Sequence, residues 1–431
     1  MSELALINAT ILDEAGTRRS DIRINDGVIV EVGQELDGDT VIDVEGLMVV
    51  PGFVDLNADL GEPGREEAET VQTGSRSAAL GGFTAVVANS DGTPSVDSPA
   101  LVAQLHDIST DARCEVVPAA ALLADANPNG LAPIGELARA GVRIFQTGTG
   151  AVPDAAMMRT ALEYCSGVAH LTEGDGVVVA ASGLDESLAA GGVMHEGAWS
   201  SRLGLPGSPA EAEEIMVARN LTLARLTGAS VHIQSVSTAR SVALVAAAKA
   251  EGLNVTADVS VANLCFDDSA CAEFDTTFKL TPPLRSSDDV DALRAGVRSG
   301  TIDAVCSGHS PQTRQDKERP FIDAPAGALG LQTAFSAALG ALDGDVEAVV
   351  AALSTNPARI ARLSDRHGGT IEVGRPANLA AVDVDAAWTL HRSALASRST
   401  NCPHVGRELR GIVRHTIWNG NVMVHNSEAT R

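Results

Sequence analysis

The sequence predicts an α/β protein, a (β/α)8 TIM-type barrel with a small β-sandwich domain formed by both chain termini. Eight short apolar runs rich in β-branched residues alternate with helical stretches between residues 49 and 306. Eight β–α units close most economically into a parallel barrel. Both ends of the chain instead carry strand-like runs joined by turns, so we expect the two ends to meet in a second, smaller domain.

Short strands and tight turns characterise the two ends of the chain. The strand-like runs cover residues 5–12, 22–32, 47–50, 376–382 and 411–424. Asp26-Gly27 interrupts the second run, and an Asp-Gly pair between alternating residues is a strong hairpin signal. We expect residues 1–50 and 365–431 to form the sandwich and residues 51–364 to form the barrel.

The apolar runs of the middle segment are the predicted barrel strands. They cover residues 49–56, 83–88, 114–120, 142–145, 177–181, 230–234, 253–259 and 302–306. Residues 211–226 and 239–250 have the apolar spacing and the helix-forming composition of outer helices. Because barrels of this kind place their chemistry at the carboxyl ends of the strands, the polar residues at those ends are the candidate functional residues.

Composition limits the class of protein. A chain of 431 residues with 45% hydrophobic and 20% charged residues is typical of a globular protein. The net charge of −25 argues against nucleic-acid and anionic-membrane partners, which would repel it. The six cysteines are scattered without a Cys-x-x-Cys pair, so we expect buried free thiols. Without a basic, apolar leader or an apolar run of about 18 residues, a cytoplasmic location is expected.

The stretch 51–64, Pro-Gly-Phe-Val-Asp-Leu-Asn-Ala-Asp-Leu-Gly-Glu-Pro-Gly, carries the most information about function. Side chains alternate faces along a strand, so Asp55, Asn57 and Asp59 are expected on one side at the barrel mouth. The stretch resembles the first barrel strand of dihydroorotases and related cyclic-amide hydrolases of the amidohydrolase superfamily. That strand reads Asp-x-His-x-His and is followed by Arg-Glu-Pro-Gly. Both histidines are absent here.

The resemblance to the dihydroorotase family extends over nearly the whole chain. Further matching motifs lie at residues 62–64, 79–84, 191–197, 236–240, 282–285, 353–358 and 406–411. The resemblance implies hydrolysis of a cyclic amide by a metal-bound hydroxide, with an aspartate that shuttles the proton to the leaving nitrogen. Active relatives supply histidines from strands one, five and six, a bridging carboxylate from strand four and the aspartate from strand eight.

In this sequence the resemblance implies a dismantled site. The positions of the metal ligands are Asn57, Asp59, Gly148, Ser182 and Ser235, and the position of the catalytic aspartate is Gly308. The remnants of the substrate pocket are Gly61, Asp91, Thr281 and His309. We therefore expect no catalytic residue, no metal and no cofactor; zinc is expected only if the chain is an active hydrolase.

Several remaining polar residues have a structural and a functional interpretation. Asp55 and Asp59 could hold magnesium, but a solvated or hydrogen-bonded pair is favoured. An acid–base pair of His309 with Asp59 is disfavoured. A loop-packing role is favoured for His195, and Cys306 is expected to be a buried small residue rather than a nucleophile.

Three hypotheses about function follow. The favoured one is a catalytically inactive dihydroorotase homologue that acts as a structural subunit of aspartate carbamoyltransferase in pyrimidine biosynthesis, as in some bacterial transferases that assemble with an inactive dihydroorotase-like chain. Its expected partners are the transferase catalytic chain and further copies of itself. The alternatives are a metal-dependent or rebuilt-site hydrolase of a cyclic amide, of dihydroorotase, hydantoinase or allantoinase type, and a small-molecule sensor that uses the emptied pocket. The first explains why the ligands are lost together while packing motifs such as Gly81-Gly82 persist.

Overall fold

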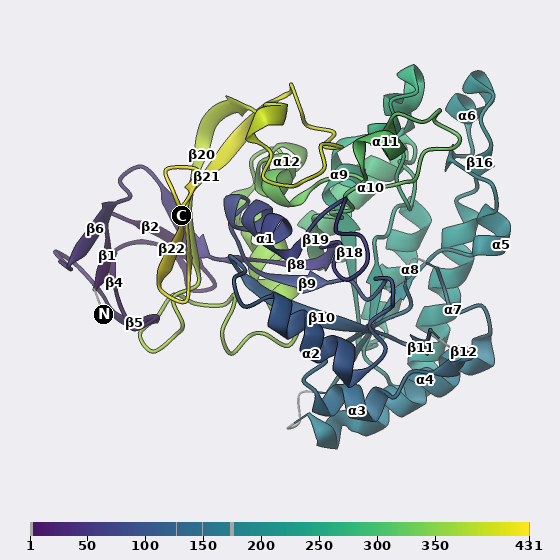
Figure 1. The fold of residues 1–431 in the computed structure, drawn as a ribbon, viewed down its shortest axis with the longest axis horizontal. Helices are drawn as coiled ribbons and strands as arrows, with labels where there is room; N and C mark the ends of the chain where they lie inside the picture. Colours follow the sequence, from purple (N-terminus) through teal and green to yellow (C-terminus); the bar gives the residue numbers. More distant parts are fainter. Residues whose placement is uncertain (1–2, 126, 149, 173–175, 431) are drawn as a thin grey trace.

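A nearly closed parallel barrel forms the centre of the protein. The computed structural model describes residues 3–125, 127–148, 150–172 and 176–430 (Figure 1). Within them, eight parallel strands form one sheet, and a bridge between Ala58 and His309 brings its last strand back to its first. In spatial order the strands are β8 (Phe53–Ala58), β9 (Phe83–Ala88), β10 (Glu115–Ala121), β13 (Ile144–Gln146), β14 (Val178–Ser182), β17 (Val231–Gln234), β18 (Val255–Ser260) and β19 (Ala304–Cys306). The predicted fold class is confirmed.

The first predicted barrel strand is in fact two strands. Residues 48–51 form β7 (Met48–Pro51), which pairs with β2 and β20 outside the barrel, and β8 begins at Phe53. The chain changes sheets at Gly52, where an added Cβ would lie 2.3 Å from the Thr84 side chain. The apolar run is continuous because both strands are buried, and so its composition alone did not reveal the break.

Helices pack around the outside of the barrel, as the apolar spacing predicts. α7 (Glu211–Thr227) and α8 (Ala239–Ala250) match the two predicted outer helices. The Thr238 side chain caps α8 by accepting a hydrogen bond from the Ser241 N–H at 3.1 Å. Gly228 ends α7 with a φ of +70°, which glycine adopts without steric cost.

Two sheets built from both ends of the chain pack at one end of the molecule (Figure 1). One sheet has the order β5-β4-β1-β6, with β5 (Val28–Gly33), β4 (Asp21–Asn25), β1 (Leu4–Ile7) and β6 (Thr40–Asp43). The other has the order β23-β22-β21-β20-β7-β2-β3, with β23 (Glu428–Ala429), β22 (Asn421–His425), β21 (Glu408–Trp418), β20 (Leu379–Thr389), β2 (Thr10–Asp13) and β3 (Gly16–Arg19). Leu6, Ile22, Leu379 and Ile417 are buried in one apolar cluster of this terminal sandwich.

The hairpin prediction is confirmed, whereas the single strand predicted over residues 5–12 is wrong. Asp26 and Gly27, at φ values of +50° and +80°, connect β4 to the antiparallel β5. Asn8, with a φ of +63°, ends β1, so the chain continues as β2 in the other sheet. Asparagine is among the residues that tolerate this left-handed conformation, so an Asn-Ala pair can end a strand without a glycine.

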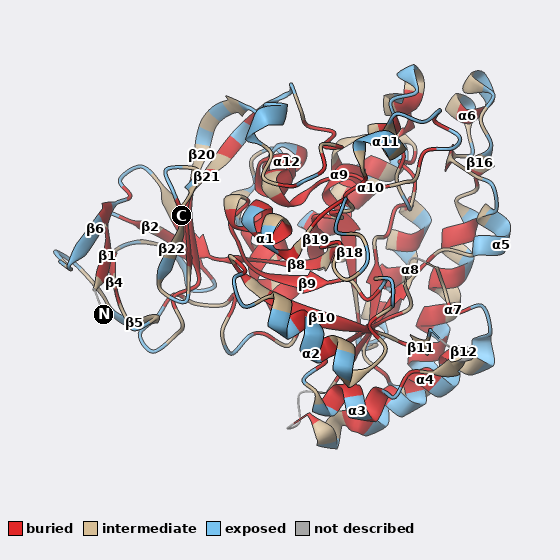
Figure 2. Cartoon of the chain, viewed as in Figure 1, coloured by how far each residue is buried: buried red, intermediate tan, exposed pale blue. Residues whose placement is uncertain are grey.

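Burial is concentrated in the barrel strands (Figure 2). Phe53 lies at the junction of barrel and terminal sheet, with its ring 5.9 Å from that of Phe83 and 5.5 Å from that of Phe335. All six cysteines are free, and five are buried. Among the described residues, no helix is long and apolar enough to cross a membrane.

Candidate functional site

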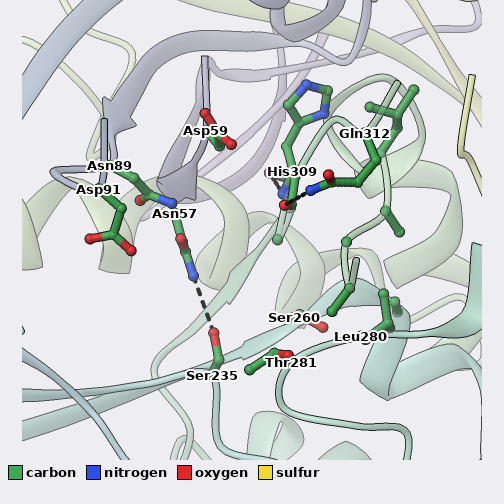
Figure 3. A pocket seen from close by; sticks show the side chains of 18 of the residues that line it. Asn57, Asp59, Asn89, Asp91, Ser235, Ser260, Leu280, Thr281, His309 and Gln312 are labelled. Carbon is green, nitrogen blue, oxygen red and sulfur yellow. Dashed lines mark hydrogen bonds between the residues drawn. The ribbon is translucent and has the colours of Figure 1, made fainter. Parts of the chain in front are cut away.

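A cavity of about 390 Å³ opens at the carboxyl ends of the barrel strands (Figure 3). Its wall includes Asn57 and Asp59 from the end of β8, Ser235 after β17, Thr281, and His309 after β19. A smaller hollow of about 70 Å³ adjoins it and shares Asn57, Ser235 and Thr281 with it. The structure therefore gathers predicted site residues from distant parts of the sequence.

Four of the five degenerate ligand positions line the smaller hollow. These four are Asn57, Gly148, Ser182 and Ser235, and Asp91 and Thr281 lie beside them. An added Cβ on Gly148 would lie 3.0 Å from Asp91 Oδ1, so these two residues are close neighbours. The family's bridging carboxylate comes from the loop after strand four, and residue 149 of this loop lies outside the described residues.

Three of the degenerate ligand positions, Asn57, Ser182 and Ser235, are engaged in hydrogen bonds. Asn57 Nδ2 donates to Ser235 Oγ at 3.2 Å (Figure 3). The Ser235 N–H donates to Asp258 Oδ1 at 2.5 Å. The Ser182 N–H donates to Thr147 Oγ1 at 2.9 Å. Hydroxyl and amide groups thus occupy positions where a zinc site would need imidazole or carboxylate.

Asp59 is paired with a cation supplied by the protein itself. Arg65 Nη1 donates to Asp59 Oδ2 at 2.6 Å, and Arg65 Nη2 donates to the Pro311 carbonyl at 2.9 Å. The Gly61 N–H donates to the other Asp59 oxygen at 2.9 Å. Gly61 has a φ of +75°, and an added Cβ there would lie 2.3 Å from the Glu69 carbonyl, so this position cannot take the family's arginine without a shift of the backbone. Sequence analysis did not identify Arg65.

His309 pairs with Glu69 and not with the Asp59 carboxylate. The Gly330 N–H donates to His309 Nδ1 at 3.4 Å, so the ring proton resides on Nε2, which donates to Glu69 Oε2 at 3.3 Å. Asp59 contacts His309 only through its backbone N–H, which donates to the His309 carbonyl at 2.8 Å. Both imidazole nitrogens are therefore engaged, and the disfavoured Asp59–His309 acid–base pair does not form.

Glu69 is a central buried residue that sequence analysis missed. Besides His309, its carboxylate accepts hydrogen bonds from the Ser397 and Thr73 hydroxyls and from the Arg398 N–H. Burial alone would raise the pKa of Glu69, but the hydrogen bond from His309 and the two hydroxyl contacts hold that pKa below its ordinary value. Glu69 thus ties the barrel mouth to the segment that follows β20.

His232 and Cys306 lie below the cavity in a buried polar network. His232 Nδ1 accepts from the Thr256 hydroxyl at 2.8 Å, and its Nε2 donates to Asp258 Oδ2 at 3.0 Å. Burial raises the pKa of the Cys306 thiol well above its ordinary value, so this residue is a poor nucleophile. The expectation that Cys306 is buried is thus confirmed.

The remaining two candidates have structural surroundings. His195 contacts the buried Arg285, whose Nη1 lies 3.3 Å from His195 Nδ1, in keeping with a loop-packing role. Gly308, at the position of the catalytic aspartate, has a φ of +58°, and an added Cβ would lie 3.0 Å from Ser260 Cβ. Restoring an aspartate at this position would therefore meet both backbone strain and a close contact.

Asp55 is fully buried and is hydrogen-bonded to Ser307 rather than paired with Asp59. Its two carboxylate oxygens accept from the Ser307 N–H at 2.7 Å and the Ser307 hydroxyl at 2.5 Å. Burial raises the pKa of Asp55 from 3.8 to about 6, partly offset by these hydrogen bonds. The folded protein therefore favours the protonated acid at a pH where the unfolded chain is already ionised.

Asp55→Asn is expected to flatten the dependence of stability on pH. Because the folded pKa is raised, its contribution to stability is complete below about pH 3.8 and is lost as pH rises to about 6. The difference corresponds to about 3 kcal/mol. Urea unfolding of wild type and variant at pH 4, 5, 6 and 7 measures it, with the exposed Asp107→Asn as a matched control. Parallel curves for wild type and Asp55→Asn would contradict the prediction.

The donor set does not fit a zinc or other transition-metal centre. Across the described residues, no group of three or more His, Cys, Asp or Glu side chains is arranged to hold a metal ion. Arg65, the sole Lys or Arg among the described residues lining the cavity, is engaged by Asp59 and the Pro311 carbonyl. The cavity wall supplies hydrogen-bond donors and acceptors, but its described residues include no set of metal ligands.

The nearly closed parallel barrel with a terminal sandwich beside it is a fold shared with solved hydantoinase structures. The L-hydantoinase (dihydropyrimidinase) from Arthrobacter aurescens has this fold, with a TM-score of 0.89 and 20% identity over 100% of this chain and 98% of that one. A D-hydantoinase (dihydropyrimidinase) from a Thermus species aligns with a TM-score of 0.82 and 22% identity over 99% and 96% of the two chains.

Sequence comparison gives the family. The model of the dihydro-orotase-like family matches residues 46–241. The dihydroorotase of Pelotomaculum thermopropionicum is 37% identical over 98% of this chain and 99% of its own length. The dihydroorotase of Mycobacterium tuberculosis is 39% identical over 95% and 96%, respectively. The chain belongs to the dihydroorotase family.

Proposed function

We propose that this chain is a non-catalytic member of the dihydroorotase family that serves as a structural subunit of aspartate carbamoyltransferase. The proposal rests on one observation: polar residues that bond to other side chains of the protein occupy positions where the family has metal ligands. Asn57 bonds Ser235, and Asp59 is neutralised by Arg65. A hydrolytic site of the family's type would instead need metal ligands that hold and activate a water molecule.

The retained architecture supports a role for the outer surface. The barrel core, the terminal sandwich and the contacts between them are intact, although no catalytic duty accounts for them. Subunit interfaces that persist commonly bury about 2,000 Å² or more, which requires a folded and rigid surface. We propose that the chain stabilises trimers of the transferase and makes homodimer contacts between its own copies.

Co-expression with the transferase tests this proposal. The catalytic chain of the transferase is expressed alone and together with this protein, and the mass and specific activity of the products are compared. We expect a stable complex of higher mass and a transferase that withstands dilution better. The proposal would be overturned if the transferase alone is correctly assembled and fully active and does not bind this chain at micromolar concentration. That result would favour a hydrolase with a rebuilt site.

One observation favours the sensor as a second candidate function. The 390 Å³ cavity retains Asn57, Asn89, Asn263 and Thr281 on its wall, which can orient a small polar molecule. A sensor would change the activity or the assembly of the complex when a ligand fills this cavity. Measuring transferase activity in the reconstituted complex with and without candidate metabolites distinguishes this role from a purely structural one.

A further inference from the structure

We propose that Phe274 and Ile322 form a docking platform for a partner protein that presents an apolar pocket rimmed by Lys or Arg. The inference rests on the proposed function, since it names the face through which a subunit would engage a partner. Phe274 directly follows η2 (Asp268–Glu273), a 3-10 helix in the loop region after β18. Ile322 lies in the loop after α11 (Arg314–Lys317; Figure 1).

Both side chains are large, apolar and half exposed. Phe274 is 47% exposed and Ile322 is 49% exposed. The Phe274 ring meets the buried Phe321 ring edge-on at 6.5 Å, which places Phe274 next to the loop that carries Ile322. Aromatic residues held in this way are typical anchors of protein interfaces.

Phe274 also occupies an unusual backbone conformation. Its φ of +58° lies in the left-handed region, which asparagine or glycine adopts at lower cost than phenylalanine. The Phe274 N–H donates to the Cys271 carbonyl at 2.9 Å, so the turn needs only a backbone donor at this position. The turn itself therefore does not account for an exposed aromatic side chain.

Two lysines hold the two loops together from within. Lys279 Nζ donates to the carbonyls of Phe321 and Ile322, both at 2.9 Å. Lys317 Nζ donates in return to the Thr276 carbonyl at 2.8 Å, and the Thr276 hydroxyl donates to the Lys317 carbonyl at 2.6 Å. These crossing contacts fix the backbone beneath Phe274 and Ile322, so little conformational entropy is lost when a partner binds.

The charge around the platform indicates the kind of partner. Glu273, Asp275 and Asp323 are exposed and flank the two apolar side chains in the sequence. Lys279 and Lys317 are directed at carbonyl groups, as described above. The exposed Arg314 and Arg319 are ion-paired within their own segment, with Glu318 at 2.6 Å and Asp316 at 2.8 Å.

The exposed charges next to the two apolar side chains are thus carboxylates, and the two inward-directed lysine ammonium groups offset their field only in part. A second copy of this chain would bring a net charge of −25 and the same acidic rim, which opposes pairing of two such platforms. An anionic membrane or a nucleic acid is repelled for the same reason. A protein face with basic residues around an apolar pocket complements both the apolar centre and the acidic rim.

Variants that retain the fold test the platform in the full-length chain. Phe274→Asn removes the anchor and places a residue that favours a positive φ, so thermal unfolding is expected to be unchanged or slightly raised. Ile322→Ser removes the second apolar side chain. Binding to the transferase catalytic chain is measured by titration, and each variant is expected to weaken it about tenfold or more. Leu226→Ser, at an apolar side chain that is 60% exposed on α7, is the matched control and should bind as wild type.

The outcomes separate the platform from the proposed function. If wild type and all variants bind equally well, the platform is wrong and the subunit role remains. If wild type itself does not bind, the subunit role and this platform both fail. A wild-type self-association that Phe274→Asn abolishes would overturn the choice of partner. Binding that weakens from 50 to 500 mM salt supports the charged rim, and binding indifferent to salt contradicts it.

Discussion

Purified protein is expected not to interconvert dihydroorotate and carbamoyl-aspartate above the uncatalysed rate. A metal-bound water has a pKa of about 7, whereas free water has a pKa of about 15.7. Without the metal, the supply of hydroxide at the site is therefore lower by about eight to nine powers of ten. The strand ends here offer Asn57, Ser182 and Ser235 in place of imidazoles. Gly308 has no side chain to carry the proton to the leaving nitrogen.

The assay needs an active reference and a restoration series. The dihydroorotase of Mycobacterium tuberculosis, measured under identical conditions with added zinc, sets the detectable rate, and elemental analysis records the metal content of both proteins. The double variant Asn57→His and Asp59→His is expected to remain inactive, since Ser182, Ser235 and Gly308 are unchanged and Arg65 loses its carboxylate partner. Steady turnover by wild-type protein free of host dihydroorotase, or a stoichiometric transition metal in it, would overturn the proposed function.

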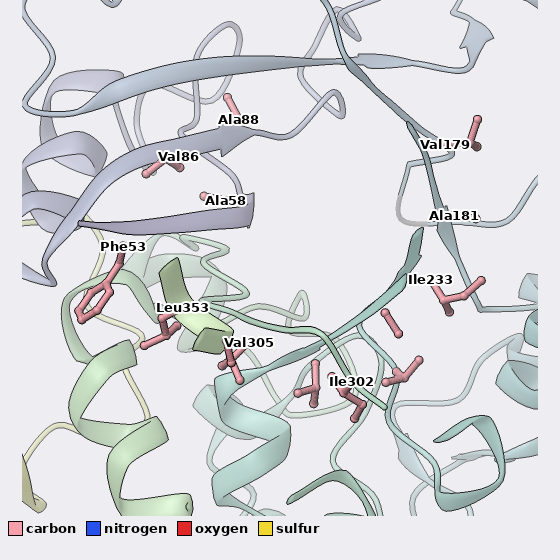
Figure 4. Close-up of a cluster of buried hydrophobic side chains, with 14 of the residues drawn as sticks. Phe53, Ala58, Val86, Ala88, Val179, Ala181, Ile233, Ile302, Val305 and Leu353 are labelled. Atoms are coloured by element: carbon pink, nitrogen blue, oxygen red, sulfur yellow. The ribbon is translucent and has the colours of Figure 1, made fainter. Parts of the chain in front are cut away.

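The barrel could be predicted because each strand is buried and leaves a continuous apolar run in the sequence. Apolar side chains such as Val86, Val179, Ile233 and Val305 come from four of the strands and share one buried cluster (Figure 4). Where strands leave the barrel, the same signal misleads. The run 49–56 is apolar except for Asp55, yet the chain changes sheets at Gly52, where the backbone closely approaches Thr84. Composition does not reveal this change.

The candidate site could be located from sequence, but its contacts could not be predicted. The alternation of side chains along β8 and the family motifs indicate where Asn57 and Asp59 lie. The partner of Asn57 is Ser235, 178 residues later in the sequence. Arg65 is close to Asp59 in the sequence, but it also donates to the distant Pro311 carbonyl. Nothing in the acidic run around Glu69 distinguishes this buried residue from its exposed neighbours, because all of its partners except Thr73 follow 240 or more residues later.

Glu69→Ala is expected to destabilise the protein by about 3–5 kcal/mol, a cost typical of removing one partner from a buried charged network. The substitution leaves the His309 Nε2–H, the Ser397 hydroxyl and the Arg398 N–H without their shared acceptor. Each unpaired buried donor costs about 1–3 kcal/mol. Urea unfolding at pH 7 measures the loss, with the exposed neighbour Glu67→Ala as the control, for which a change within about 0.5 kcal/mol is expected.

The dependence on pH distinguishes loss of the charge from loss of the side chain. The pKa of Glu69 is lowered in the folded protein, so its ionic contribution is present above the ordinary value of 4.5 and is lost as pH falls through the folded pKa. Glu69→Gln retains the shape but not the charge, so its deficit relative to wild type should shrink in acid, whereas the deficit of Glu69→Ala should persist in part. A deficit of Glu69→Gln that does not change between pH 7 and pH 3 would contradict an ionised Glu69. A loss below about 1 kcal/mol for Glu69→Ala would mean that the mouth is held to the segment after β20 by other contacts, such as those of Asn401 with the carbonyls of Ser310 and Gly327.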